Sequence, residues 1–178
     1  MKYSQHACVA LLAVFAAGTV SAQAIGKDAG YYAEAGYTPL QIHNDNNGFQ
    51  GEPKLARLTV GKVITDNLAV EGFYAFTVAQ DSTTDHGVTY NLNANMFGAY
   101  LKPKVAITQG IEAFARVGAV HSKFDDEYSS VSGTKLSYGL GIQAHLTQNV
   151  YAQVDYMNYY KQDGIGAKGF TVSVGTRF

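Results

Sequence analysis

Strict alternation of apolar and polar residues closes the chain. In residues 170–178 one set of alternate positions carries Phe170, Val172, Val174 and Phe178, with Thr176 as its polar member. The other set is small or polar. A period of two residues predicts a β-strand with one apolar and one polar face. What this strand can fold into depends on which face meets water.

The same alternation recurs upstream. It covers residues 31–38, 54–64, 68–78, 90–100, 111–119, 136–146 and 150–159. Thr65, Thr108 and Thr147 mark three tight turns of one form, 43 and 39 residues apart. That interval fits a strand, a longer polar loop and a returning strand. The pattern predicts eight strands with short turns at one end and longer loops at the other, which is typical of a bacterial outer-membrane barrel.

The N-terminus predicts a secretory signal at residues 1–22, with cleavage possibly as late as residue 24. A positive start at Lys2 precedes an uncharged, mostly apolar run at 7–17 and small-residue cleavage patterns at 20–22 and 22–24. The run is too short to cross a bilayer as a helix. The predicted mature domain is therefore 23–178. The only cysteine, Cys8, falls within the signal, so no disulfide or cysteine-based metal site is expected.

The chemistry of the two strand faces indicates which one meets lipid. The apolar sets lack charge at mid-strand, whereas the opposite sets are small or polar residues with isolated charges of both signs. A soluble ligand-binding barrel would show the reverse, with many charges outside. We therefore expect the apolar sets to face lipid and the polar sets to line a narrow lumen.

This assignment also places individual side chains. In segment 90–100 it turns Tyr90, Leu92, Ala94, Met96 and Tyr100 to lipid, and Asn91, Asn93, Asn95 and Phe97 to the lumen. Two aromatic girdles are predicted, as at membrane interfaces. They consist of Tyr31, Tyr100 and Phe178 at the turn end, and of Tyr74, Phe76, Tyr90, Tyr138, Tyr156 and Phe170 at the loop end.

With these features the mature chain resembles, over its whole length, the small outer-membrane β-barrel superfamily of the OmpA membrane domain, OmpX and opacity-type proteins. The resemblance implies an all-β fold: an eight-stranded antiparallel up-and-down transmembrane barrel with short periplasmic turns and longer extracellular loops. It implies a place in the bacterial outer membrane beside lipopolysaccharide. It also implies that the assembly machinery reads Phe170, Val172, Val174 and Phe178; Thr176 departs from that pattern.

Charges on the lumen side predict an ion-pair network, because an unpaired buried charge costs several kcal/mol. Its predicted members are Glu34, Arg57, Glu71, Glu112, Arg116, Asp155 and Arg177. Glu34 and Arg177 are candidates for a pair, since the first and last strands are neighbours in a closed barrel. The network would act as a plug or as a gate, and the narrow lumen favours the plug.

The expected function is structural or surface interaction, in membrane integrity or adhesion, by a monomer with an unidentified extracellular or host ligand. The alternatives are a narrow channel for small solutes and a soluble periplasmic ligand-binding barrel. No enzyme is expected: Ser137, His145 and Asp155 face the lumen, but the first two lie about 26 Å apart on one strand. No metal or cofactor is expected. The formal charge, −1 with Lys2 and −2 without it, gives no reason to expect nucleic acid.

Overall fold

The computed structural model describes residues 30–178, except 47, 86–87, 126–129 and 163. The predicted signal, residues 1–22, lies outside the described residues. In the described part of the chain, no helix has the length and apolar character needed to cross a membrane.

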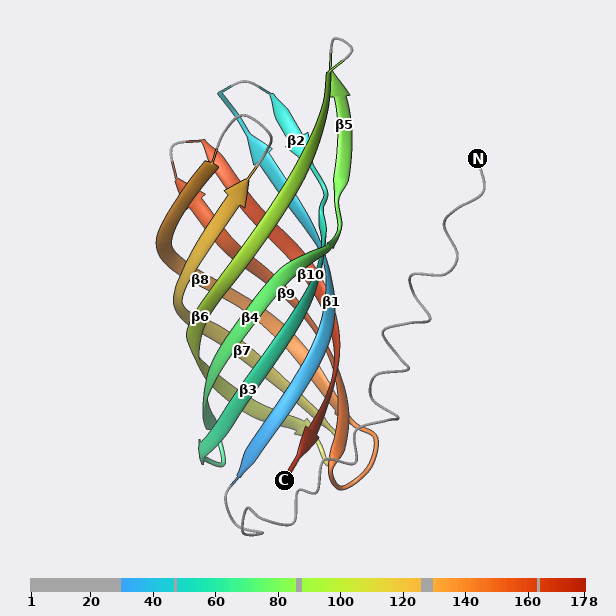
Figure 1. Ribbon diagram of the computed structural model, residues 1–178. Helices are drawn as coiled ribbons and strands as arrows, with labels where there is room; N and C mark the ends of the chain where they lie inside the picture. Colours follow the sequence, from blue (N-terminus) through green and yellow to red (C-terminus); the bar gives the residue numbers. More distant parts are fainter. Residues whose placement is uncertain (1–29, 47, 86–87, 126–129, 163) are drawn as a thin grey trace, which may run out of the picture.

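Antiparallel strands account for nearly all of the described chain (Figure 1). They are β1 (Tyr31–Asn44), β2 (Phe49–Gly51), β3 (Lys54–Thr65), β4 (Leu68–Ala79), β5 (Asp81–Asp85), β6 (Val88–Thr108), β7 (Ile111–Asp125), β8 (Ser130–His145), β9 (Val150–Gln162) and β10 (Ile165–Arg177). β10 pairs with β1 as well as with β9, so the sheet closes on itself. The short β2 and β5 pair with β1 and β6 at the loop end. The predicted closed, eight-stranded barrel is confirmed.

The repeated tight turns lie together at one end of the barrel (Figure 1). Thr108 Oγ1 accepts a hydrogen bond of 3.3 Å from the amide of Gly110, and Thr147 Oγ1 accepts one of 3.0 Å from Val150. In each case the threonine hydroxyl accepts from a backbone amide at the turn. This accounts for the threonines at 108 and 147. At the other end, Gly164 adopts a φ of 80° between β9 and β10, which favours glycine.

Pairing between β6 and β7 is interrupted beside Pro103. Leu101 pairs with Val117, and the next paired residue is Lys104. Proline has no N–H to donate to the ladder, which accounts for the break. Lys102, next to the break, is buried inside the barrel.

Side-chain exposure confirms the predicted faces in every barrel strand except β6. Its residues Ala94, Met96 and Tyr100 are buried in the lumen, whereas Phe97 and Leu101 are exposed on the outside. The prediction was therefore wrong for the part of segment 90–100 whose side chains are described, residues 93–100; those of Asn91 and Leu92 lie outside the described part. Both faces of this strand carry apolar residues, so hydrophobicity alone does not separate them. Tyr100 consequently leaves the predicted turn-end girdle; the side chain of Tyr90 lies outside the described part.

Candidate functional site: the barrel interior

Arg116 of β7 lies at the centre of the lumen and contacts carboxylates from three other strands. Its Nε donates to Glu71 Oε2 at 2.5 Å, its Nη1 to Asp155 Oδ2 at 2.7 Å and its Nη2 to Glu34 Oε2 at 3.0 Å. A planar guanidinium with five N–H donors can bind several carboxylates at once. Arg116 therefore ties β7 to β4, β9 and β1 across the lumen.

Two further cations complete this central network. Arg57 of β3 pairs with Asp155 through both carboxylate oxygens, at 2.9 Å for Nη1 to Oδ1. Lys102 Nζ of β6 lies 3.2 Å from Glu34 Oε1 and 3.0 Å from Glu71 Oε1. All six charged side chains are exposed by 3% or less. Three cations thus balance three carboxylates away from water. Pairing of this kind is needed because an unpaired buried charge inside the barrel would cost several kcal/mol.

Two tyrosines occupy the space left by glycines on the lumen side. The hydroxyls of Tyr32 and Tyr151 donate hydrogen bonds of 2.7 and 2.9 Å to network carboxylates. A Cβ added at Gly61 would lie 2.2 Å from the Tyr32 ring, and one at Gly175 would lie 2.4 Å from the Tyr151 ring. The small residues predicted for the lumen therefore fix where these rings lie.

We expect Gly175→Ala to destabilise the barrel by about 1–3 kcal/mol, because the new methyl group displaces the Tyr151 ring from a filled interior. The measurement is urea unfolding in detergent micelles, followed by tyrosine fluorescence. Gly110→Ala is the matched control, since a Cβ at Gly110 meets nothing within 4 Å. Equal midpoints for the two variants would show that Tyr151 relaxes freely.

A second cluster surrounds Glu112 of β7 near the turn end. Its carboxylate lies 3.2 Å from Lys104 Nζ, 3.4 Å from Arg177 Nη2 and 3.3 Å from His145 Nε2. Gln143 Nε2 donates to it at 2.9 Å. The charged side chains here are between 13 and 32% exposed. Each partly solvated pair is therefore worth about 0–1 kcal/mol, whereas removing one partner from the central network would leave a buried charge unpaired at a higher cost.

The charged residues predicted for the lumen divide between these two clusters. The central network holds Glu34, Arg57, Glu71, Arg116 and Asp155. The cluster around Glu112 at the turn end, called the mouth cluster below, holds Glu112 and Arg177. The predicted Glu34–Arg177 pair is not formed. Across the seam Glu34 lies opposite Gly175, whereas Arg177 lies opposite Tyr32, nearer the turn end. There Glu112 binds Arg177, while cations from across the lumen bind Glu34.

Lys102 is the main network residue missed by the sequence reasoning. The prediction turned its strand the wrong way, which left alternate residues of β6 on the lipid side. One signal was present: the predicted set held one carboxylate more than it held arginines. Buried carboxylates need cationic partners, so this excess pointed to a further cation on the lumen side.

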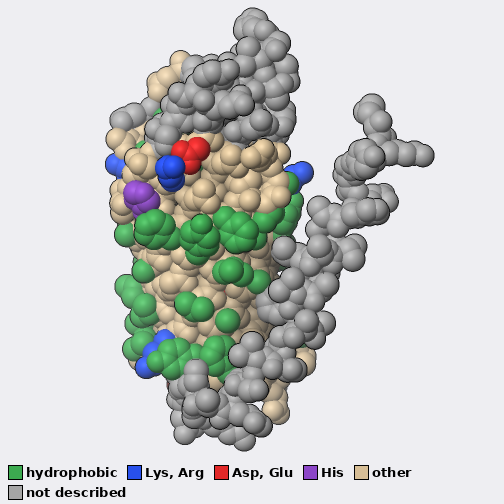
Figure 2. Space-filling model, viewed as in Figure 1, with side chains coloured by type: hydrophobic (Ala, Val, Ile, Leu, Met, Phe, Trp, Pro, Cys, Tyr) green, Lys and Arg blue, Asp and Glu red, His purple; other side chains and the backbone are tan. Residues whose placement is uncertain are grey.

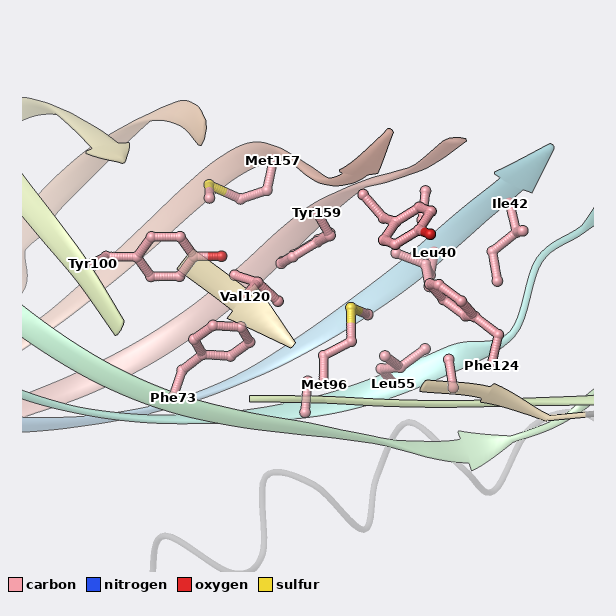
Figure 3. Packing of buried hydrophobic residues seen from close by; sticks show 14 residues of the cluster. Leu40, Ile42, Leu55, Phe73, Met96, Tyr100, Val120, Phe124, Met157 and Tyr159 are labelled. Carbon is pink, nitrogen blue, oxygen red and sulfur yellow. The ribbon is translucent and has the colours of Figure 1, made fainter. Parts of the chain in front are cut away.

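The loop-side half of the interior is apolar. Phe73 stacks on Tyr100 with ring centres 5.0 Å apart, and Phe124 meets Tyr160 edge-on at 5.7 Å. Figure 3 shows this packing between the strands. Its members are Leu40, Ile42, Leu55, Phe73, Ala75, Ala94, Met96, Tyr100, Val120, Phe124, Met157, Tyr159, Tyr160 and Ala167. The expectation of a polar interior is therefore corrected: it holds toward the turn end only.

The three residues weighed as a catalytic set are kept apart. Ser137 Oγ contacts the Tyr100 hydroxyl at 2.9 Å and the Asn158 carbonyl at 2.7 Å. His145 belongs to the mouth cluster and Asp155 to the central network. In the described part of the chain, no group of three or more His, Cys, Asp or Glu side chains could hold a metal ion.

The outer wall carries the aliphatic and aromatic side chains that a bilayer requires. Figure 2 shows large apolar side chains gathered in two bands with smaller ones between them. At the loop end, Tyr156 and Phe170 lie with ring centres 4.6 Å apart, and Tyr74 and Phe76 at 5.8 Å. At the turn end, Lys62 Nζ lies 5.0 Å from the ring centre of Tyr31.

Known proteins share this architecture. The family described as "Outer membrane protein beta-barrel domain" matches residues 10–178. The chain belongs to this family. The resemblance to small outer-membrane barrels and the bacterial outer-membrane location are thereby confirmed. The alternative of a soluble periplasmic barrel was wrong.

Individual relatives extend this finding. The attachment invasion locus protein of Yersinia enterocolitica is 27% identical over 97% of this chain and 94% of its own length. The crystal structure of the Yersinia pestis attachment invasion locus protein with the heparin analogue sucrose octasulfate has a TM-score of 0.63, at 20% identity over 83% of this chain and 97% of that chain. Neisserial surface protein A has a TM-score of 0.62, at 16% identity over 84% and 97%. At these identities the two structures establish the fold alone.

Proposed function

We propose that this chain is a surface attachment protein: a monomeric barrel, closed to solutes, whose loop end contacts an extracellular or host ligand. The observation that carries the proposal is the interior. The charged side chains of its central network are exposed by 3% or less, and an apolar cluster lies above them. Such packing favours a plug over a solute path. The full-length similarity to an attachment invasion locus protein supports the same class of role.

The charge of the loop end limits the kind of ligand. Acidic residues outnumber lysines in the loop segments and adjoining strand ends. The acids are Asp45, Glu52, Asp81, Asp85, Asp125, Asp126, Glu127 and Asp163; the lysines are Lys54, Lys123, Lys135, Lys161 and Lys168. By sequence, these segments carry a net negative charge, which repels polyanions. The proposed ligand is therefore not a highly sulfated polysaccharide of the kind that the heparin analogue represents.

Attachment is tested by displaying the protein on a non-adherent bacterium and counting bacteria bound to cultured epithelial cells. We expect more bound bacteria than with the empty vector, and no inhibition by added heparin. Attachment at the level of the empty vector would contradict the proposed role. Strong inhibition by heparin would contradict the argument from loop charge.

Conductance decides between a plug and the alternative, a narrow channel for small solutes. We expect no stepwise current from the purified monomer in planar bilayers, because the buried network and the apolar cluster occupy a narrow lumen. Steps that scale with salt concentration and persist in the monomer would favour the channel. A porin reconstituted in parallel serves as the positive control.

The remaining parts of the proposal concern processing and assembly. Cleavage after residue 22 or 24 would leave a mature chain that begins at Gln23 or Ile25, which mass spectrometry of the intact protein checks. Phe170 and Val172 are exposed on the lipid side of β10, where assembly machinery can read them. No catalytic role is proposed, since the candidate residues lie in separate clusters. Outer-membrane lipid and lipopolysaccharide are the proposed lateral partners of the apolar wall.

A further inference from the structure

We propose that a groove on the outer wall, formed by β1, β2 and β10 at the loop end, binds an uncharged saccharide. The groove encloses about 530 Å³, within the range of small-molecule sites. It is lined by Gln41, Ile42, His43, Asp45, Gln50, Gly51, Glu52 and Lys168. The proposal goes beyond attachment, because sugar binding at this groove can be measured without cells.

The groove is built by strand pairing. β1 lies between two partners here: Gln41 is opposite Lys168 of β10, and His43 is opposite both Gly166 of β10 and Gln50 of β2. The floor of the groove is therefore a sheet whose central strand is paired on both sides. β1 therefore offers no free edge in the groove floor, so a peptide strand cannot add to it there.

Glycine on β10 sets the position of the histidine. A Cβ added at Gly166 would lie 2.2 Å from the His43 ring, which shows that the ring lies directly over this residue. His43 is half-buried, while Gln41, Gln50 and Glu52 are exposed. The imidazole thus forms a fixed wall beside side chains that can turn toward a ligand.

The lining matches a hydroxyl-rich ligand better than other classes. Two glutamine amides each supply donors and an acceptor, Glu52 supplies acceptors and Lys168 supplies donors. Gln41 Nε2 already donates to Glu52 Oε1, at a long 3.4 Å, and this contact can be exchanged for ligand hydroxyls. The lining holds one lysine and two carboxylates, Asp45 and Glu52, which disfavours phosphate or sulfate because these require clustered cations.

Other ligand classes fit less well. Among the described lining residues, the only apolar side chain belongs to Ile42, which is 6% exposed and packs into the interior. The described lining also lacks a set of three metal-ligating side chains. An uncharged sugar is the class that remains for a polar groove of this size.

The groove lies above the loop-end aromatic band, and this position allows the sugar to come from two sources. Lys168 lies two residues above Phe170, which is 60% exposed and belongs to the loop-end aromatic band. Two residues of strand cover about 6.6 Å. The groove therefore opens just outside the hydrocarbon layer, within reach of sugars on neighbouring lipopolysaccharide and of glycans on another cell.

The test is an NMR titration of the mature protein in phosphatidylcholine nanodiscs. The probes are dephosphorylated lipopolysaccharide core oligosaccharide, an uncharged N-acetyllactosamine trisaccharide, and sucrose octasulfate. We expect saturable shifts of the Gln41 and Gln50 side-chain amides with at least one uncharged probe. The core oligosaccharide would identify the cell's own membrane as the source, and the trisaccharide would identify another cell. Sucrose octasulfate should leave these amides unchanged.

Variants connect the shifts to the groove. Gln50→Ala should weaken binding by about tenfold, the effect of losing one or two hydrogen bonds. Gly166→Ala should also weaken it, because the new methyl group displaces the His43 ring from the groove. Gln80→Ala is the control, since its exposed amide bonds to Asn93 outside the groove. Correct folding of each variant is verified by its heat-modifiable gel shift. Absence of saturable shifts with both uncharged probes, a response to the sulfated probe alone, or unchanged affinity in Gln50→Ala would overturn the proposal. None of these outcomes depends on attachment to cells.

Discussion

Replacing Arg116 by alanine is expected to destabilise the folded barrel by about 3–5 kcal/mol, the range for breaking a buried ion pair by removing one partner. Arg116 contacts Glu71, Asp155 and Glu34 at 2.5–3.0 Å. Without it, three carboxylates share two cations in a space that water does not reach. The measurement is the urea midpoint in lipid vesicles, read as the folded fraction in the heat-modifiable gel shift.

Two further variants separate charge from packing. Arg116→Met keeps most of the side-chain volume, so it should lose nearly as much stability as the alanine variant if charge dominates. Lys123→Ala removes an ion pair with Asp125 whose side chains are 53% and 30% exposed, so the change should be under about 1 kcal/mol. A methionine variant close to wild type would assign the loss to the cavity. Wild-type stability in both Arg116 variants would contradict the network argument.

The residue types of the network could be predicted from sequence, but most of their partners could not. Arg57 and Asp155 were recognisable because a charge on the small-residue face of a strand must point into the lumen. Which carboxylate each cation meets depends on how the strands tilt and stagger around the barrel. Arg177 therefore pairs with Glu112 of β7 at the turn end of the lumen, and not with Glu34 of the neighbouring strand β1.

The fold was predictable wherever the two faces differ in polarity. In β8, Leu140 and Ile142 alternate with Gly139 and Gly141, so the faces separate clearly. In β6, Met96 faces an apolar part of the interior. Because Met96 alternates with the polar Asn95, the pattern predicts that Met96 faces lipid, which is wrong. The faces of β6 were misassigned because the residues that it turns into this apolar part of the lumen are themselves apolar.

The outer groove lay beyond the reach of the sequence pattern. Residues 43–48 are a polar run, which predicts only a loop. Nothing in the sequence indicates that Gln50, after this run, pairs with His43. A three-residue strand such as β2 is too short for a period of two to be detected. The juxtaposition of Lys168 with Gln41 likewise depends on closure of the sheet between its first and last strands.

Placing a charge on the lipid face should have the second large effect. Ile142 of β8 is 55% exposed and lies midway between two exposed residues, Tyr138 toward the loop end and Leu146 just past the end of β8. Ile142→Arg is expected to destabilise the barrel in vesicles by about 2–4 kcal/mol, the range for arginine near the bilayer midplane. Urea titration in vesicles measures it.

Depth in the bilayer provides the control. Leu146, four residues away and just beyond the turn end of β8, is 62% exposed. Leu146→Arg should lose only about 0–1 kcal/mol because arginine there reaches the interface. Ile142→Ala removes the same apolar contact without adding charge and isolates the contribution of the guanidinium. A loss that falls from mid-strand to strand end depends on depth, which only a surrounding bilayer imposes. Equal losses at both positions would instead indicate that the outer wall of β8 packs against protein, and the assignment of the apolar face to lipid would then be wrong.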